Sequence, residues 1–214
     1  KNLLYKGLAI TFSIMFFSLF FAQSIYKNKV SQLDSDIFHL KNEMHEEKLF
    51  KAFSDQFSHD VTVCKLYESY LGTLSNKVYQ TGSYMERLYK DDKNVEELKN
   101  TQKEWVYLNI DLWLRVMKYN KVCNQKKNYI LYFYPYQCLK CSPFSLTLKS
   151  LNEKYKQSLW LFSIPAEIDI KMVKVMMKYY KIKNTPAVVV NGNVLVGLES
   201  VSKIEKYLYK TAKK

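Results

Sequence analysis

Residues 134–144 read YPYQCLKCSPF and place two cysteines, Cys138 and Cys141, three positions apart. The run of apolar and aromatic residues at 129–134 comes directly before them and is typical of a buried strand. Apolar residues then recur at helical spacing between positions 144 and 155. The pair therefore falls where a strand ends and a helix begins. Three interpretations are open for such a pair: a redox centre, half of a metal site or a structural bridge.

The residues that follow predict a compact domain over 127–214. The second strand, LWLFSI, is read as buried, and Asn191-Gly192 is a strong signal for a hairpin between the last two strands. The order is β-α-β-α-β-β-α, which predicts a mixed four-stranded sheet with helices on both faces. The elements after the first helix are expected at 159–164, 170–180, 187–190, 194–196 and 201–208.

This order resembles the thioredoxin-like family over about residues 128–210. The residues that carry the resemblance are the CxxC pair after the first strand, Thr185-Pro186 before the third, the Asn-Gly hairpin and Gly197. The resemblance implies a thiol–disulfide oxidoreductase in which Pro186 is cis and lies beside the cysteines. It also implies that the strand edge at Pro186 binds a substrate peptide through backbone hydrogen bonds and that Thr185 contacts the active sulfurs.

The chemistry of the pair also follows from its position. Cys138 near the start of a helix faces the positive end of the helix dipole, and Lys140 adds a cation, so both favour a thiolate. Cys138 is therefore expected to be the nucleophile, and Cys141 the thiol that resolves a mixed disulfide. This mechanism needs no cofactor.

Two positions depart from the pattern of the family. Gln137 replaces the usual tryptophan before the first cysteine, which leaves Tyr136 as the nearest aromatic residue for substrate binding. Tyr132 stands where many thioredoxins carry a buried acid. Neither these residues nor the dipeptide between the cysteines tells whether the protein is a reductase, an oxidase or an isomerase.

A zinc site and an inert bridge are the alternatives for the CxxC pair. A four-cysteine zinc site requires a second close pair, but the other two cysteines, Cys64 and Cys123, are far apart in the sequence, and all three histidines lie upstream at positions 39, 45 and 59. No metal site is predicted. An inert bridge in a domain that only docks a partner stays open.

Residues 28–126 contain no proline and are predicted to form a helical stalk domain. Helices are expected at about 60–89 and 95–122, folded back around the polar residues 91–94. Because Cys64 and Cys123 are equidistant from this turn, an antiparallel hairpin brings them level, and a structural disulfide is predicted. Two buried free thiols are the alternative.

The first 27 residues predict a membrane segment. Residues 7–26 form an uncharged stretch of the length that crosses a bilayer, and an uncleaved signal anchor fits it better than a cleaved signal peptide or a core helix. Apolar residues then recur every three or four positions between 30 and 44. This spacing fits a short coiled coil that forms a homodimer, or a plain amphipathic helix.

The protein carries a net charge of +13 in its 214 residues. From Lys127 onward there are 15 basic and 5 acidic residues, so most of the excess lies in the C-terminal domain. This charge favours acidic proteins or anionic lipids as partners. The lysines are scattered along helical segments without a nucleic-acid motif, so solvated lysine faces are the favoured interpretation and no nucleic acid is predicted as a partner.

Together these features predict an α+β chain: an anchor at 1–27, a helical domain at 28–126 and a thioredoxin-like domain at 127–214. The predicted function is a membrane-anchored, extracytoplasmic thiol–disulfide oxidoreductase that acts on protein disulfides or dithiols and exchanges electrons with a membrane redox partner. A thiol carrier in cytochrome maturation or in a disulfide relay shares this chemistry. The alternative class is a membrane-tethered interaction protein with a redox-inert docking domain.

Overall fold

The computed structural model describes residues 38, 41–42, 45–46, 48–57, 60–91, 94–136, 141–155, 158–198 and 201–208. The chain divides into two compact units, residues 1–56 and 57–214. All the described residues of the first unit are helical. The predicted membrane segment at 7–26 and the apolar positions of the predicted coiled coil lie outside the described residues. Within the described part of the chain, no helix has both the length and the apolar character to cross a membrane.

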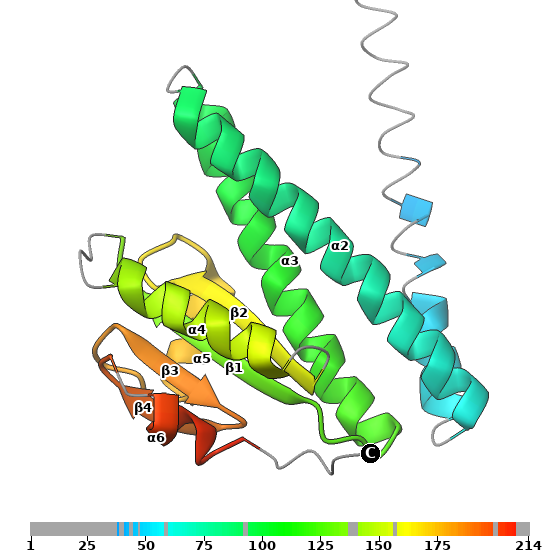
Figure 1. The fold of residues 1–214 in the computed structure, drawn as a ribbon. Helices are drawn as coiled ribbons and strands as arrows, with labels where there is room; N and C mark the ends of the chain where they lie inside the picture. Colours follow the sequence, from blue (N-terminus) through cyan, green and yellow to red (C-terminus); the bar gives the residue numbers. More distant parts are fainter. Residues whose placement is uncertain are drawn as a thin grey trace, which may run out of the picture. The chain divides into compact units, whose positions relative to one another are not determined.

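Helices α2 (Val61–Asp91) and α3 (Val95–Val122) form a long antiparallel hairpin, as Figure 1 shows. The side chain of Asp60 caps α2, since it accepts hydrogen bonds from the backbone N–H groups of Thr62 at 2.7 Å and Val63 at 3.1 Å. Asn94 caps α3 in the same way. The absence of proline from residues 60–122 lets both helices run without a break, as the sequence predicts.

Four strands form a mixed sheet in the order β2-β1-β3-β4. The central strand β1 pairs in parallel with β2 and antiparallel with β3, and β3 and β4 form the predicted hairpin. Asn191 and Gly192 both have positive φ angles of 48° and 89°, the conformation that the two-residue turn requires. The strands are β1 (Asn128–Tyr134), β2 (Leu159–Pro165), β3 (Ala187–Val190) and β4 (Asn193–Val196).

Helices cover both faces of the sheet, as predicted. Helix α4 (Cys141–Tyr155) and α6 (Val201–Glu205) lie on one face, where their apolar residues pack with alternate residues of β1 and β3. The opposite face meets α3 and the end of α5 (Lys171–Tyr179). There the Trp113 ring of α3 lies 6.4 Å from the rings of both Tyr129 and Tyr180. Alternate residues of the strands thus belong to two separate cores.

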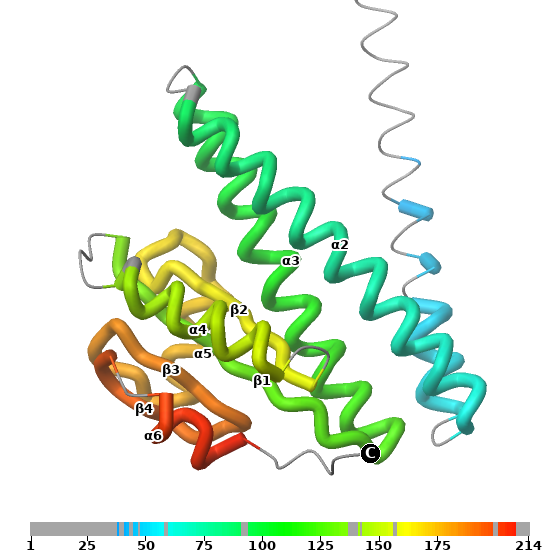
Figure 2. The backbone as a smooth tube through the Cα atoms, viewed as in Figure 1, coloured from blue at the N-terminus to red at the C-terminus, as the bar shows by residue number. Residues whose placement is uncertain are grey.

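Helix α3 packs directly against β2, so the hairpin and the sheet belong to the same compact unit, 57–214. Figure 2 traces α3 alongside the sheet over much of its length. This packing is not predictable from the sequence, because an apolar helical stripe does not identify the surface that it covers. A division into a stalk domain and a thioredoxin-like domain near residue 127 stays a prediction.

Candidate active site

Cys141 is the first residue of α4, directly beyond the loop that follows β1. Its side chain is buried, and its sulfur is disulfide-bonded. The hydroxyl of Ser145 donates a hydrogen bond to the backbone oxygen of Cys141 at 2.9 Å, within the first turn. The predicted nucleophile Cys138 and the neighbouring Lys140 lie outside the described residues. Of the predicted pair, the structure therefore describes the expected resolving cysteine.

Thr185 and Pro186 lie at the same end of the sheet as this loop, where β1 ends and β3 begins. Phe133 of β1 pairs with Ala187 of β3, and because the two strands are antiparallel, Pro186 is level with Tyr134 at the end of β1. The Thr185–Pro186 peptide bond is cis. The backbone oxygen of Pro186 accepts a hydrogen bond from the N–H group of Gly197 at 2.8 Å, which ties this segment to the end of β4.

Tyr136 lies beyond the end of β1 with 46% of its surface exposed. Its backbone N–H donates to the carboxylate of Glu167 at 3.4 Å, and its hydroxyl lies 3.5 Å from the side-chain oxygen of Gln102 in α3. Burial raises the pKa of the Tyr136 hydroxyl, and the negative charge of Glu167 acts in the same direction. The hydroxyl is therefore a neutral donor at physiological pH, two residues before Cys138.

A cavity of about 420 Å³ lies between this loop and the first half of α3. Its wall combines Tyr136 with residues of α3 and of the loop after β2. The contribution of α3 has no signal in the sequence, because its residues precede the cysteine pair by more than thirty positions and carry no motif. The lining residues are Glu96, Lys99, Asn100, Gln102, Lys103, Tyr136, Ile168 and Asp169.

Tyr132 is buried beneath the site on the α4 face of the sheet. Its ring lies 5.3 Å from the ring of Phe144 and 5.5 Å from that of Tyr134. Burial raises the pKa of the Tyr132 phenol, with the Ser145 side chain acting in the opposite direction. Burial also raises the pKa of Tyr134, to about 12. Both phenols stay protonated near neutral pH and accept no proton from a thiol there.

The second cysteine pair is bonded in the structure. Cys64 of α2 and Cys123, the last residue of the hairpin, form a disulfide with their Cα atoms 5.7 Å apart. The two residues are separated by 59 positions and stand level across the hairpin, as their equal distance from its turn predicts. No group of three His, Cys, Asp or Glu side chains within the described part of the chain is arranged to hold a metal ion.

Comparisons with known proteins find similarity in structure only. No protein-family model matches the chain, and no curated protein matches it in sequence. Solved structures that resemble it include the germline-specific thioredoxin Deadhead of Drosophila melanogaster, with 18% identity, a TM-score of 0.36 and coverage of 45% of this chain and 90% of that one. Oxidised thioredoxin of Plasmodium falciparum has 18% identity and a TM-score of 0.33 and covers 44% and 92%. A malarial protein has 17% identity and a TM-score of 0.33 and covers 39% and 99%.

The strand order and pairing define the C-terminal part as a thioredoxin-like fold. A parallel β1–β2 pair is joined to an antiparallel β3–β4 hairpin, and a cysteine begins the helix after β1. The Thr-Pro pair leads into β3, level with the end of β1. The fold thus brings Cys141, Pro186 and Tyr136 to the same end of the sheet, where β1 ends. Helix α3 of the hairpin adds a wall beside Tyr136.

Proposed function

We propose that the protein is a membrane-anchored, extracytoplasmic thiol–disulfide oxidoreductase that exchanges disulfides with protein substrates through Cys138 and Cys141. The observation that carries the proposal is the position of Cys141. This residue is buried, disulfide-bonded and placed at the start of α4, at the end of the sheet where Pro186 also lies. A resolving cysteine requires this shielded position, because it must react with its neighbour in the motif and not with solvent or other proteins.

The proposed reaction in the reducing direction has two steps. The thiolate of Cys138 attacks one sulfur of a substrate disulfide, forms a mixed disulfide and releases the other substrate sulfur as a thiolate. The thiolate of Cys141 then attacks the sulfur of Cys138, which forms the Cys138–Cys141 disulfide and releases the second substrate thiolate. Two electrons pass from the motif to the substrate. The oxidising direction is the reverse of these steps.

Each feature of the site has a role in this scheme. The helix dipole of α4 and the charge of Lys140 favour the Cys138 thiolate. The strand edge at Thr185 and Pro186 holds an extended substrate segment, and the exposed ring of Tyr136 packs against it. Because the phenol of Tyr132 keeps its proton, the proton of Cys141 leaves to solvent or to the departing substrate thiolate.

The membrane and the compartment belong to the proposal as well. Residues 7–26 anchor the chain, and the catalytic part faces an oxidising compartment, where a disulfide such as Cys64–Cys123 persists. A redox partner in the same membrane restores the oxidation state of the motif after each turnover. Carbonate extraction of native membranes tests the anchor, and alkylation of intact cells with a membrane-impermeant reagent tests the orientation.

Trapping of reaction intermediates tests the chemistry. In a Cys141→Ser variant of the full chain, Cys138 forms mixed disulfides that cannot be resolved. Covalent complexes therefore accumulate, which are visible on non-reducing gels and are cleaved by dithiothreitol. A Cys138→Ser, Cys141→Ser variant is the matched control and forms none. Both are made in a Cys64→Ala, Cys123→Ala background so that no other thiol reacts.

Titration of the motif against a thiol–disulfide buffer separates the proposal from its alternative. Mass spectrometry of the alkylated protein is expected to show a reversible two-electron equilibrium between the dithiol and the disulfide. If Cys138 of the reduced, folded protein does not react with the alkylating reagent, the domain is a redox-inert docking module and the proposal is wrong.

A further inference from the structure

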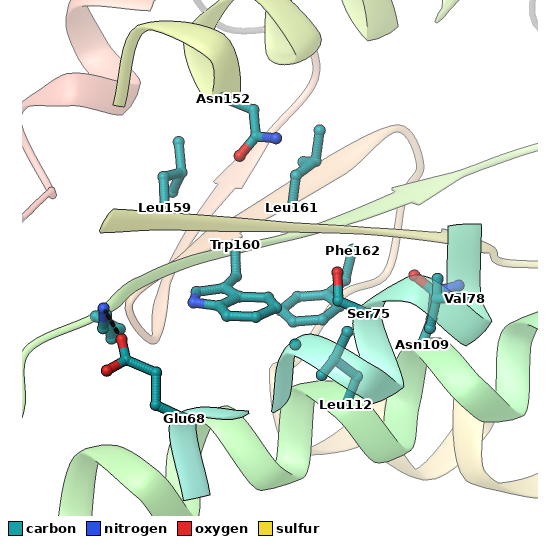
Figure 3. A pocket seen from close by; sticks show the side chains of 12 residues that line it. Glu68, Ser75, Val78, Asn109, Leu112, Asn152, Leu159, Trp160, Leu161 and Phe162 are labelled. Carbon is teal, nitrogen blue, oxygen red and sulfur yellow. Dashed lines mark hydrogen bonds and ion pairs between the residues drawn. The ribbon is translucent and has the colours of Figure 1, made fainter. Parts of the chain in front are cut away.

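A second cavity runs along the outer edge of β2. Tyr136, Cys141 and Pro186 of the candidate active site do not line it. It is an open groove of about 690 Å³, within the size range of binding pockets. Figure 3 shows its walls on both sides of the strand, with Leu159 and Leu161 on one side and Trp160 and Phe162 on the other. A cavity that touches both faces of one strand follows the edge of that strand.

The edge of β2 is free for pairing. Among the described residues, β2 pairs with β1 alone and is the last strand of the sheet. A strand in this position presents a row of backbone N–H and C=O groups that can pair with another chain. Proteins often bind extended peptides by adding them as a strand to such an edge. The backbone of β2 is seven residues long, enough for a short added strand.

Helix α2 stands across the groove and leaves space for an added strand. Its residues Glu68, Gly72, Ser75 and Val78 line the groove at the spacing of one helical face. A Cβ atom built on Gly72 would meet no atom within 4 Å, so the smallest side chain of this face borders open space. Glycine in the interior of a helix costs stability relative to alanine, and packing within the chain does not require it here.

Two polar atoms in the walls of the groove lack partners. The indole Nε1 of Trp160 and the side-chain oxygen of Asn152 are buried and make no hydrogen bond within the described part of the chain. Figure 3 places these side chains on opposite sides of β2. Buried polar groups are nearly always hydrogen-bonded in folded proteins. Both side chains line the groove, and a rotation of either one would bring its polar atom to a segment bound there.

The net positive charge of the protein favours an acidic occupant of the groove. Lys126 and Lys127 precede β1, whose first residue pairs with Leu159, so they stand at the Leu159 end of the groove. Lys127 forms an ion pair with Glu68 at 2.8 Å, and Lys126 is exposed. With a net charge of +13, two copies of the chain repel one another, whereas an acidic segment is attracted.

We propose that the groove binds an extended, acidic segment of a partner protein, which adds to the sheet as a strand beside β2. The segment runs between β2 and α2, and its acidic side chains lie toward Lys126. This site is separate from the Thr185–Pro186 segment, which leads into the interior strand β3, so the proposal does not depend on the redox activity of the motif.

Selection from a random peptide library tests the proposal. Phage that display nine-residue peptides are panned against the full chain, and those that also bind a Gly72→Trp variant are removed. The indole of this variant fills the groove. The selected peptides are expected to be rich in Asp and Glu and in β-forming residues, and to lose at least tenfold in affinity on Gly72→Trp. Asn76→Trp, on an exposed position of the same helix, is the matched control and is expected to keep the affinity.

Two further measurements check the mode of binding. Hydrogen exchange of the backbone amides in β2 is expected to slow at least tenfold when a selected peptide is bound. Lys126→Glu is expected to weaken binding several-fold, and added salt to do the same. A selection that yields no peptide dependent on Gly72, or peptides without acidic residues, overturns the proposal. So does a dimer of the full chain that Gly72→Trp converts to a monomer, because the occupant is then a second copy.

Discussion

The hydroxyl of Tyr136 lies 3.5 Å from the side-chain oxygen of Gln102, a residue 34 positions earlier in the chain. This contact joins the loop before the CxxC pair to the first half of α3. A thioredoxin-like sheet therefore carries, beside its motif, a wall from a helix that precedes the sheet in sequence. In the proposed reaction, a substrate that reaches the cysteines would meet the helical hairpin as well as the segment at Pro186.

Loss of this wall is expected to impair reactions with proteins but not with small thiols. Gln102→Ala or Tyr136→Ala should lower kcat/KM for a protein disulfide about threefold to tenfold, equivalent to the loss of about one hydrogen bond. The rate with dithiothreitol should stay unchanged, because a small reagent does not contact α3. Tyr107→Ala, an exposed position further along α3, is the control. An equal loss with both kinds of substrate would contradict the role of the wall.

Tyr132→Phe is expected to leave the redox reaction unchanged. The pKa of this phenol is raised by burial, so it remains protonated near neutral pH and cannot accept the proton of Cys141. Stopped-flow measurement of the resolving step between pH 6 and 9 should give the same profile for both proteins. If the profile of the variant shifts along the pH axis, the hydroxyl takes part in proton transfer.

The Cys64–Cys123 disulfide should stabilise the protein substantially. It closes a loop of 59 residues, and the chain-entropy model gives about 4 kcal/mol for a loop of this length. Urea unfolding of the Cys64→Ala, Cys123→Ala variant should show this decrease in the free energy of unfolding. In excess reductant, wild type and variant should unfold at nearly the same urea concentration, which separates the bond from the packing of the side chains.

Substitution by alanine should change the stability of the protein differently at the two glycines of α2. Gly72→Ala adds a Cβ atom to open space and should stabilise the protein by about 0.5–1 kcal/mol through helix propensity. Gly82→Ala puts a Cβ atom 2.9 Å from the indole nitrogen of Trp105, so the ring must move and the gain is lost. Thermal unfolding of the two variants checks the difference. Equal shifts in Tm would contradict the close packing at Gly82.

The contact between α4 and α6 should weaken in acid. The carboxylate of Glu205 accepts hydrogen bonds from the amine of Lys154 at 2.6 Å and the hydroxyl of Tyr155 at 3.1 Å. These partners, Lys154 first, lower the pKa of Glu205 below its usual value of 4.5. Because this pKa is depressed by folding, the contact contributes fully above pH 4.5 and is lost as the pH falls through the folded pKa. Hydrogen exchange in α6 should be faster in Glu205→Gln than in wild type at pH 7.

The same comparison in acid completes the test. Below the folded pKa of Glu205, both proteins carry a neutral side chain at this position, and their exchange rates in α6 should converge. A difference that persists unchanged in strong acid would assign the effect of the substitution to packing. A second ion pair, Lys174–Asp169 at the start of α5, lies elsewhere in the fold and should be unaffected by the substitution.

Much of the C-terminal fold was predictable from the sequence because its signals are local. The apolar run at 129–134 and the Asn191-Gly192 turn identify β1 and the β3–β4 hairpin without reference to distant residues. The antiparallel helices follow from the polar turn at 91–94 and the absence of proline. The run LWLFSI predicts a buried strand, and four of the seven residues of β2 are buried; the sequence does not show that β2 is the edge strand of the sheet. An apolar strand looks the same in sequence whether its edge is paired with a strand or borders a groove between helices.

The site shows the same division between local and distant signals. Cys141 at the start of α4 and Pro186 near the end of β1 lie where the motif order implies. The α3 wall depends on how a helix docks on a sheet, which no pattern within α3 encodes. Glu96, Lys99 and Lys103 look like an ordinary solvated helix face in the sequence. Only the contact with Tyr136 relates that face to the cysteine motif.

The hairpin also keeps the two cysteine pairs chemically separate. Cys123 ends α3, and Gln102, which contacts Tyr136, lies 21 residues earlier, about 30 Å away at 1.5 Å per residue. Direct exchange requires two sulfur atoms in contact, so we expect no exchange between the Cys64–Cys123 bond and the motif that follows Tyr136 within the folded chain. In the proposed function, a permanent bond and a reactive position therefore belong to opposite ends of one helix. Exchange at the motif with a protein partner would then leave the covalent closure of the hairpin intact.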